Sequence, residues 1–331
     1  LRRDRVLADR IERLKAEAAR EGGEDDDTDD RLRLIFTCCH PALALEARVA
    51  LTLKSLGGLT TAEVARAFLV PEATMYQRLL RAKRKIADAR IPYRVPPPEL
   101  LPDRLSGVLA VVYLVFNEGY SPAAGDRAVR GELCGEAIRL GRLLVNLMPD
   151  EAEVRGLLAL MLLHDARRAA RVDDAGAYVP LDRQDPARWD AGRIAEGRAE
   201  LHRALARRTP GQYQVQAAIA ALHVEEGETD WPQVAALYGA LEHYAPTPVV
   251  RVNRAAALAF AGDAARGLEV LVPLLEDRRM ARYQPLHAAH AELLHRTGDA
   301  AGARAAYDRA LELTENAVDR AELERRKAAL A

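Results

Sequence analysis

Residues 59–86, LTTAEVARAFLVPEATMYQRLLRAKRKI, carry the signals for two helices joined by a tight turn. Thr60 and Glu63 have the spacing of a capping box, in which the threonine hydroxyl accepts from the backbone N–H three residues on and the glutamate reaches back. The first helix is expected to end before Pro71, because proline interrupts a helix that it does not begin. Pro71 suits the first turn of a second helix, which we expect over residues 71–90.

The second helix is strongly basic and amphipathic. Between residues 72 and 90 it carries six Lys and Arg against two carboxylates, so about +4 of charge lies on one helix. On a helical wheel one apolar stripe is expected to face the core; it comprises Met75, Leu79, Ala82 and Ile86. Two short helices, the second basic and amphipathic in this way, are typical of a helix-turn-helix.

The face opposite this stripe has the chemistry that reads DNA, because glutamine and arginine offer paired hydrogen-bonding groups to base edges in the major groove. The expected base-reading residues are Tyr76, Gln77, Leu80 and Arg81. The expected contacts to the DNA backbone, which supply affinity and register, are Thr74, Arg78, Lys83, Arg84 and Lys85. An ordinary solvated basic helix is the alternative, but the cap, the turn and the wheel together favour DNA binding.

The overall composition excludes several other classes of protein. Lys and Arg number 48 against 49 Asp and Glu, so a net charge of −1 excludes a polycation that coats nucleic acid, and any binding must come from a local patch. The longest apolar run, residues 108–116, is far shorter than the about 20 residues that span a membrane. Three cysteines favour a reducing cytoplasm. No Ser-His-Asp set, P-loop or GxGxxG can be assembled, so we expect neither an enzyme nor a cofactor.

Composition and periodicity divide the chain into five parts and predict an all-α fold. Residues 1–30 combine the end of a longer helix with an acidic stretch, EGGEDDDTDD, whose composition predicts a solvated linker. The helix-turn-helix region follows over 31–90. Five prolines in residues 91–104 predict a stiff linker through which no helix runs. Amphipathic helices then predict a central helical domain over 105–190 and a helical array over 191–331.

The C-terminal part contains an internal repeat. Gly262-Asp263 recurs as Gly298-Asp299, an offset of 36 residues, and each copy lies between two helical patterns rich in alanine. Helix pairs with a period near 34 are typical of tetratricopeptide repeats, in which each pair buries its apolar face only against its neighbours. The core candidates in the helices before the repeat are Leu201, Leu205, Ile219, Leu222, Val234 and Leu237.

Residues 59–86 resemble region 4 of bacterial sigma factors of the extracytoplasmic-function (ECF) type. The resemblance rests on the Leu-Thr cap, the Val-Pro turn and the run Arg-Leu-x-Arg-Ala-Lys, and residues 31–59 resemble the first helices of that region. The segments CCHPAL, YLVFNEGY, PLDRQDPARWD, GQYQVQAAIAALH and TDWPQVAALY resemble the subgroup with a long C-terminal extension of tetratricopeptide character. The resemblance thus extends over nearly the whole chain.

This resemblance implies a role in transcription. In such factors region 4 recognises the minus-35 promoter element and docks on the β-flap of core RNA polymerase, and the four base-reading positions named above match the family's groove-facing sites. The acidic linker lies where the family threads a negatively charged connector through the polymerase cleft, although an inert tether explains it equally well. Region 2 is missing, and residues 1–20 resemble only the tail of its last helix, so we expect this chain to be a fragment of a sigma factor.

Residues outside the helix-turn-helix offer weaker candidates. Asn117, Glu118 and Tyr120 are candidates for a contact with polymerase or with another domain. The alternative, which we favour, is a helix C-terminus at which Gly119 takes a positive φ and Asn117 acts as cap. Three groups suggest a metal but lack a set of ligands at suitable spacing, so none is expected; they are Cys38-Cys39-His40, His164-Asp165 and His287 with His290. The two cysteines are expected to be buried thiols at a helix end.

The predicted function is promoter recognition as part of an alternative sigma factor, with the C-terminal extension regulating activity in cis. The predicted partners are promoter DNA, core RNA polymerase and a protein regulator on the repeat array, with no membrane partner. The main alternative is a one-component transcriptional regulator whose array binds a small molecule or a peptide. A scaffold with a vestigial basic helix is a more distant alternative.

Overall fold

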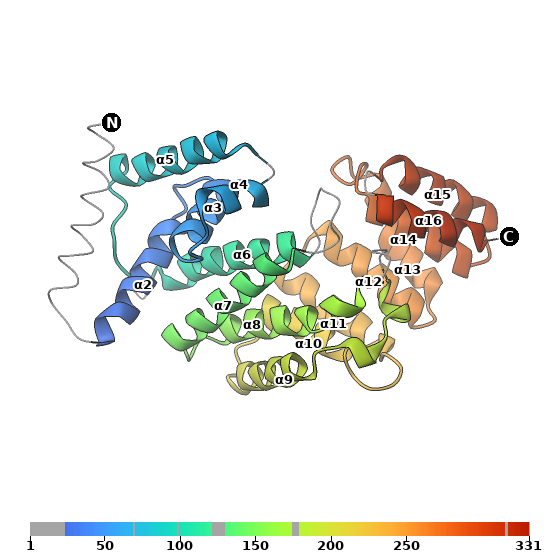
Figure 1. The fold of residues 1–331 in the computed structure, drawn as a ribbon. Coiled ribbons are helices and arrows are strands. Elements are labelled where there is room, and N and C mark those ends of the chain that lie inside the picture. Colours follow the sequence, from blue (N-terminus) through green and yellow to red (C-terminus); the bar gives the residue numbers. More distant parts are fainter. Residues whose placement is uncertain are drawn as a thin grey trace. The chain divides into compact units, whose positions relative to one another are not determined.

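The computed structural model describes residues 24–68, 70–97, 99–120, 130–173, 179–314 and 317–330. In these residues fifteen α-helices and three short 3-10 helices form the regular structure, which confirms the all-α prediction (Figure 1). The chain divides into two compact units. Unit 1 comprises Leu1–Glu118 and Gly135–Pro149, and unit 2 comprises Gly119–Cys134 and Asp150–Ala331. No helix within the described ranges is both long and apolar enough to cross a membrane.

Unit 1 is built around the two helices predicted from residues 59–86. Its helices are α2 (Glu24–Cys38), α3 (Leu45–Ser55), α4 (Thr61–Ala67), α5 (Glu72–Asp88) and the greater parts of α6 (Leu101–Tyr120) and α7 (Gly131–Leu147). α5 packs against α3 and α4, and α3 packs against α2. The side chains at the centre of this packing are at most 1% exposed: Phe36, Leu51, Leu53, Val64 and Met75. Met75 is the α5 residue of this group, and its burial against the other helices contributes about 1.5–3 kcal/mol, which holds α5 on its apolar side.

Both predicted linkers are partly helical, and this corrects the sequence analysis. α2 begins at Glu24, so most of the acidic stretch continues directly into a helix. Carboxylates in a first turn are stabilised by the positive end of the helix dipole, an effect that composition alone does not express. α6 begins at Leu101, inside the proline-rich stretch, with Pro102 in its first turn, where the missing N–H has no intrahelical partner to lose.

The non-helical residues before α6 do not form a free tether. Ile91 is buried. The Thr37 hydroxyl on α2 donates to the carbonyl oxygen of Pro92 at 3.3 Å, and the Tyr93 hydroxyl donates to the carbonyl oxygen of Asp30 at 3.0 Å. The start of the proline-rich stretch therefore lies along α2.

Unit 2 is a series of helices in which each helix from α8 onward packs against the next. They are α8 (Ala152–Asp165), α9 (Ala191–Ala206), α10 (Gln212–Leu222), α11 (Trp231–Tyr244), α12 (Pro248–Phe260), α13 (Ala264–Leu275), α14 (Gln284–Arg296), α15 (Ala300–Glu312) and α16 (Ala317–Ala328). The segment between α8 and α9 contains the 3-10 helices η1 (Arg168–Ala170), η2 (Leu181–Arg183) and η3 (Pro186–Arg188).

The repeated Gly-Asp pair forms the same turn in both copies, between α12 and α13 and between α14 and α15. Gly262 has φ 93° and Gly298 has φ 86°, the left-handed conformation that favours glycine after a helix. The carboxylate of Asp263 accepts from the backbone N–H of Arg266 at 3.1 Å, and the carboxylate of Asp299 accepts from the N–H three residues on at 2.8 Å. Each pair thus forms a turn between two helices, as predicted, and its aspartate also caps the second helix.

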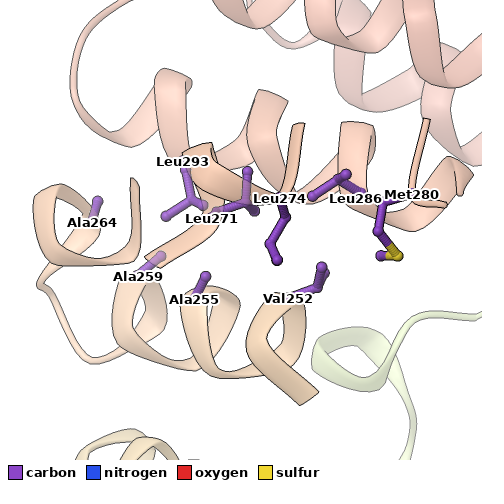
Figure 2. Close-up of a cluster of buried hydrophobic side chains, with 9 residues drawn as sticks. All are labelled: Val252, Ala255, Ala259, Ala264, Leu271, Leu274, Met280, Leu286 and Leu293. Carbon is purple, nitrogen blue, oxygen red and sulfur yellow. The ribbon is translucent and has the colours of Figure 1, made fainter. Parts of the chain in front are cut away.

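One buried cluster joins α12, α13 and α14, as Figure 2 shows. It comprises Val252, Ala255, Ala259, Ala264, Leu271, Leu274, Met280, Leu286 and Leu293. A glycine on α13 permits this close packing: a Cβ atom at Gly267 would lie 2.8 Å from the carbonyl oxygen of Ala255 and 2.5 Å from the Leu293 side chain. Small residues therefore set how closely these helices approach.

Of the core candidates before the repeat, all but one are at least partly buried. Leu201, Ile219, Leu222 and Val234 are buried and Leu237 is half-buried. Leu205 is 49% exposed, so its prediction is wrong. The buried stripe of α9 runs through Gly197, Leu201 and Ala204 and leaves Leu205 at its edge.

Candidate nucleic-acid interface

The capping box predicted at the start of α4 is confirmed. The backbone N–H of Thr60 donates to the carboxylate of Glu63 at 2.6 Å, and the N–H of Glu63 donates to the Thr60 hydroxyl at 3.2 Å. α4 ends at Ala67, earlier than expected, and α5 begins at Glu72. Pro71 lies at the N-cap, with φ −58°, and so just before the first turn rather than in it.

The apolar stripe of α5 faces the core of unit 1. Met75 is fully buried, Leu79 and Ala82 are buried, and Ile86 is half-buried near the C-terminal end of the helix. The stripe fixes which side of α5 is turned outward, because a rotation of the helix would expose Met75 and Leu79. The polar residues of the helix are therefore presented on a defined face.

The predicted base-reading residues occupy that outward face. Tyr76 is 52% exposed, Gln77 and Arg81 are exposed, and Leu80 is half-buried. Tyr76 is one of the few large hydrophobic side chains on the surface, and an aromatic side chain beside glutamine and arginine is suited to contact with base edges and thymine methyl groups. That these four residues contact DNA bases remains a prediction.

The predicted backbone contacts lie around the same face. Thr74, Arg84 and Lys85 are exposed, whereas Arg78 and Lys83 are half-buried. Arg78 and Lys85 border a groove of about 510 Å³, whose other side is formed by the start of α3 and the turn that precedes it. The opposite wall of this groove consists of Ala42, Leu43, Ala44, Glu46 and Ala47.

Arg81 borders this groove as well, a position that the wheel did not predict. It therefore lies between two groups of residues: Gln77 on one side, which is expected to read bases, and Arg78 with Lys85 on the other, which are expected to contact phosphates. The Arg81 Nε atom is 3.4 Å from the carbonyl oxygen of Gln77, one helical turn earlier. From this position Arg81 could contact either a base or a phosphate group.

Sequence reasoning missed the residues that shape the far wall of the groove. Arg48 donates from Nε to the carbonyl oxygen of Leu43 at 2.9 Å and from Nη2 to that of Pro41 at 3.1 Å. The Nδ1 atom of His40 accepts from the backbone N–H of Ala42 at 3.1 Å, and partial burial lowers the pKa of His40. These are contacts of side chains to a turn, so no periodicity in the sequence could have indicated them.

Cys38 and Cys39 are buried thiols at the end of α2, as predicted. Burial raises the pKa of Cys38 to about 12 and that of Cys39 to about 11, so both are protonated at neutral pH. In the described part of the chain no group of three or more His, Cys, Asp and Glu residues could hold a metal ion.

Asn117, Glu118 and Tyr120 lie in the last turn of α6 and are half-buried. The expected helix end at Gly119 is wrong. The helix continues through Tyr120, and Gly119 does not take a positive φ. Its role is close packing instead, because a Cβ atom there would lie 2.7 Å from the backbone nitrogen of Cys134.

Tyr120 is packed inside unit 2. Its ring lies 5.2 Å from that of His164, and the guanidinium of Arg171 lies 3.7 Å above the ring centre. A contact of Tyr120 with polymerase stays a prediction, but these neighbours give the side chain a structural role within its own unit.

Two segments of the chain match known families. Residues 33–86 match Sigma-70, region 4, and residues 104–205 match a family of unknown function (DUF6596). The chain thus contains a sigma-70 region 4, which is a helix-turn-helix domain with a DNA-binding role in transcription.

A curated protein is similar over most of the chain. It is the "Uncharacterized protein R00370" of Rhizobium meliloti (strain 1021), 45% identical over 296 residues, which are 88% of this chain and 70% of that protein. The chain belongs to the same family as this rhizobial protein.

Proposed function

We propose that this protein recognises the minus-35 element of promoters and binds the β-flap of core RNA polymerase, as part of a sigma factor of the ECF type. The observation that carries the proposal is the outward face of α5, where exposed Tyr76, Gln77 and Arg81 stand opposite the buried stripe, within a segment that matches sigma-70 region 4. The proposal includes the expectation that region 2 is missing from this chain.

In this proposal unit 2 regulates the activity of the DNA-binding region. Its α12–α13 and α14–α15 pairs share one turn and one spacing, which supports a tetratricopeptide-like array. Arrays of this kind present extended binding surfaces, so we propose that unit 2 regulates transcription in cis or through a bound protein.

Run-off transcription with purified core RNA polymerase tests the proposal. The chain is compared with a version extended to the full N-terminus of its gene, and only the extended version is expected to initiate at a specific promoter. In that version Gln77→Ala should relax the sequence preference at one position of the minus-35 element, whereas Arg278→Ala, which removes an exposed cation of unit 2, should leave the preference unchanged.

A one-component regulator is the second candidate, and a cavity of about 1,220 Å³ in unit 2 favours it, because the cavity offers a place at which a small molecule or a peptide could bind. If neither version of the protein initiates transcription, and the chain binds a palindromic duplex as a dimer, this second function replaces the first.

A further inference from the structure

The segment that joins α8 to α9 includes residues 179–190, which we call the strap. The strap is fixed at both ends. The backbone N–H of Val179 donates to the carbonyl oxygen of Arg171 at 2.8 Å, and that of Asp190 donates to the carbonyl oxygen of Ala166 at 2.9 Å. Both acceptors lie shortly after the end of α8, so the strap leaves α8 and returns to it as a closed loop.

Between its two ends the strap contacts a helix far along the chain. Nη2 of Arg183, in η2, donates to the carboxylate of Glu322 on α16 at 2.6 Å, across 139 residues of sequence. Burial raises the pKa of Asp319, one turn earlier on α16, and the charge of Arg171 opposes that effect. Helices of a repeat array pack mainly against their neighbours in sequence, so a contact of this range joins parts of unit 2 that the array alone does not connect.

Glu322 is the centre of this contact, and its side chain is only 12% exposed. Nη2 of Arg325 and Nε of Arg326 donate to its Oε1 atom at 2.8 and 2.7 Å. Burial alone would raise the pKa of Glu322, but these hydrogen bonds and the charge of Arg183 lower the pKa to about 2. The carboxylate is therefore ionised at neutral pH, and its attraction to Arg183 depends on charge screening rather than on protonation.

Few apolar contacts hold α16 in place. The helix packs against α15. Among the side chains described for α16 only Leu323 is buried, and Leu330 is buried just beyond the helix. Lys327 forms an ion pair with Asp308 on α15. Because a helix with few buried apolar contacts opens locally at a low cost in free energy, the contact with the strap is a substantial part of what holds α16.

Both sides of the contact also border the cavity of unit 2. Leu181 and Gln184 line the cavity from the strap, and Arg325 and Arg326 line it from α16. The ion pair of Arg183 with Glu322 therefore joins two walls of the cavity, and separation of α16 from the strap would open the cavity on that side.

We propose that Arg183 and Glu322 form an electrostatic clasp, which holds α16 against the strap and controls access to the cavity of unit 2. When the clasp is closed, α16 covers one side of the cavity. When screening by salt weakens the ion pair, α16 separates from the strap and the cavity is exposed to solvent. This inference goes beyond the proposed function and does not rest on it, because the clasp is measured without DNA or polymerase.

Hydrogen exchange of the full chain, read by mass spectrometry, measures the opening of α16 directly. Arg183→Ala should accelerate exchange of the α16 amides about two- to fivefold, the range expected for the loss of one partly exposed ion pair. Arg309→Ala is the matched control and should leave α16 unchanged. It removes an ion pair of 2.7 Å with Glu312 on α15, away from the cavity, and Arg309 is 46% exposed against 43% for Arg183.

Salt provides a test on the unaltered protein. An increase from about 50 to about 500 mM salt should accelerate exchange of the α16 amides in the unaltered chain and in Arg309→Ala. The same increase should have a smaller effect in Arg183→Ala, in which the clasp is already open. An equal salt effect in all three proteins would contradict the electrostatic clasp.

Tryptophan emission measures access to the cavity. Trp189 and Trp231 are the only two tryptophans in the chain and both line the cavity, so quenching of their emission by acrylamide, which is uncharged, reports on its exposure. Arg183→Ala and Glu322→Gln should each increase quenching, and Arg309→Ala should not. The double variant should do no more than Glu322→Gln alone, because both changes remove the same contact.

Thermal melting shows whether each variant is folded, and Glu322→Gln takes the place of Arg183→Ala if the latter does not fold. Unchanged exchange of α16 in both variants would overturn the proposal. Exchange that rises equally in α12, α13 and α16 would do the same, because it would reflect a general loss of stability. Faster exchange of α16 with unchanged quenching would refute the control of access to the cavity.

Discussion

The position of Arg81 between two groups on α5 makes its replacement by alanine the most informative change in the protein. If Arg81 reads a base, Arg81→Ala should relax sequence preference at one promoter position and leave the other positions unchanged. Lys85→Ala is the matched control, because Lys85 is an exposed cation on the same helix and borders the same groove. It should weaken binding to all sequences equally.

The size of each effect follows from the kind of contact. A bidentate contact of arginine to guanine discriminates by about 1–3 kcal/mol, so Arg81→Ala should reduce discrimination at its position about 5- to 150-fold. A phosphate contact contributes about −0.9 to the slope of log K against log salt. The four predicted phosphate contacts of α5 then give a slope of about −3.6; they are Arg78, Lys83, Arg84 and Lys85. Lys85→Ala should lower the magnitude of this slope by about 0.9, which corresponds to an about 3.5-fold smaller change in affinity between about 50 and 200 mM salt.

The assay uses the full chain with labelled duplexes obtained from a binding-site selection. Fluorescence anisotropy gives the affinity for the selected site, for its single-base variants and for an unrelated duplex, each at several salt concentrations. If Arg81→Ala weakens all duplexes equally and reduces the salt slope by about 0.9, Arg81 contacts phosphate together with its neighbours in the groove, and the assignment of Arg81 as base-reading is refuted.

Three further predictions concern stability and are checked by denaturant unfolding with matched variants. Thr60→Ala should destabilise unit 1 by about 0.5–2 kcal/mol through loss of the α4 cap, whereas Thr60→Ser should be nearly neutral; equal losses would contradict the capping role. Gly267→Ala should destabilise unit 2 by about 1–3 kcal/mol because a methyl group has no space there, whereas Gly239→Ala, whose Cβ would meet only the flexible Arg254 at 3.7 Å, should be neutral or stabilising; a tolerated Gly267→Ala would refute the packing argument. Burial, with a smaller contribution from nearby Arg167, lowers the pKa of His223 to about 4. Below about pH 6.5 the unfolded state therefore binds more protons than the folded state, and the free energy of unfolding falls as the pH is lowered. His223 should account for a loss of about 2 kcal/mol between about pH 7 and pH 5, and His223→Gln should remove that loss.

The helix-turn-helix was the most predictable part of the molecule. The capping box and the stripe through Met75 and Leu79 are local patterns, and each is confirmed by hydrogen bonds or burial. The Gly262-Asp263 turn was predictable for the same reason, because a positive-φ glycine followed by a capping aspartate acts within a few residues. Features that depend only on residues a few positions apart in the sequence can therefore be predicted without knowledge of the fold.

The errors share a different cause. Gly119 looks like a helix end in sequence, but it lies inside α6, and the close approach of the Cys134 backbone explains why this position has no side chain. Leu205 fits the apolar pattern of α9, yet it lies at the edge of the buried stripe and is 49% exposed. Both outcomes depend on which helix packs where, which local periodicity does not encode.

The cavity of unit 2 was hidden from the sequence for a more general reason. Periodicity reports the middle of a helix, where one face is buried. Several residues that line this cavity lie instead at helix ends: Trp231 is the first residue of α11, Phe260 the last of α12 and Arg296 the last of α14. Each has an ordinary local explanation, such as a cation in a last turn that complements the helix dipole. They come together around one cavity only because successive helices pack side by side, which the local pattern of each helix does not encode.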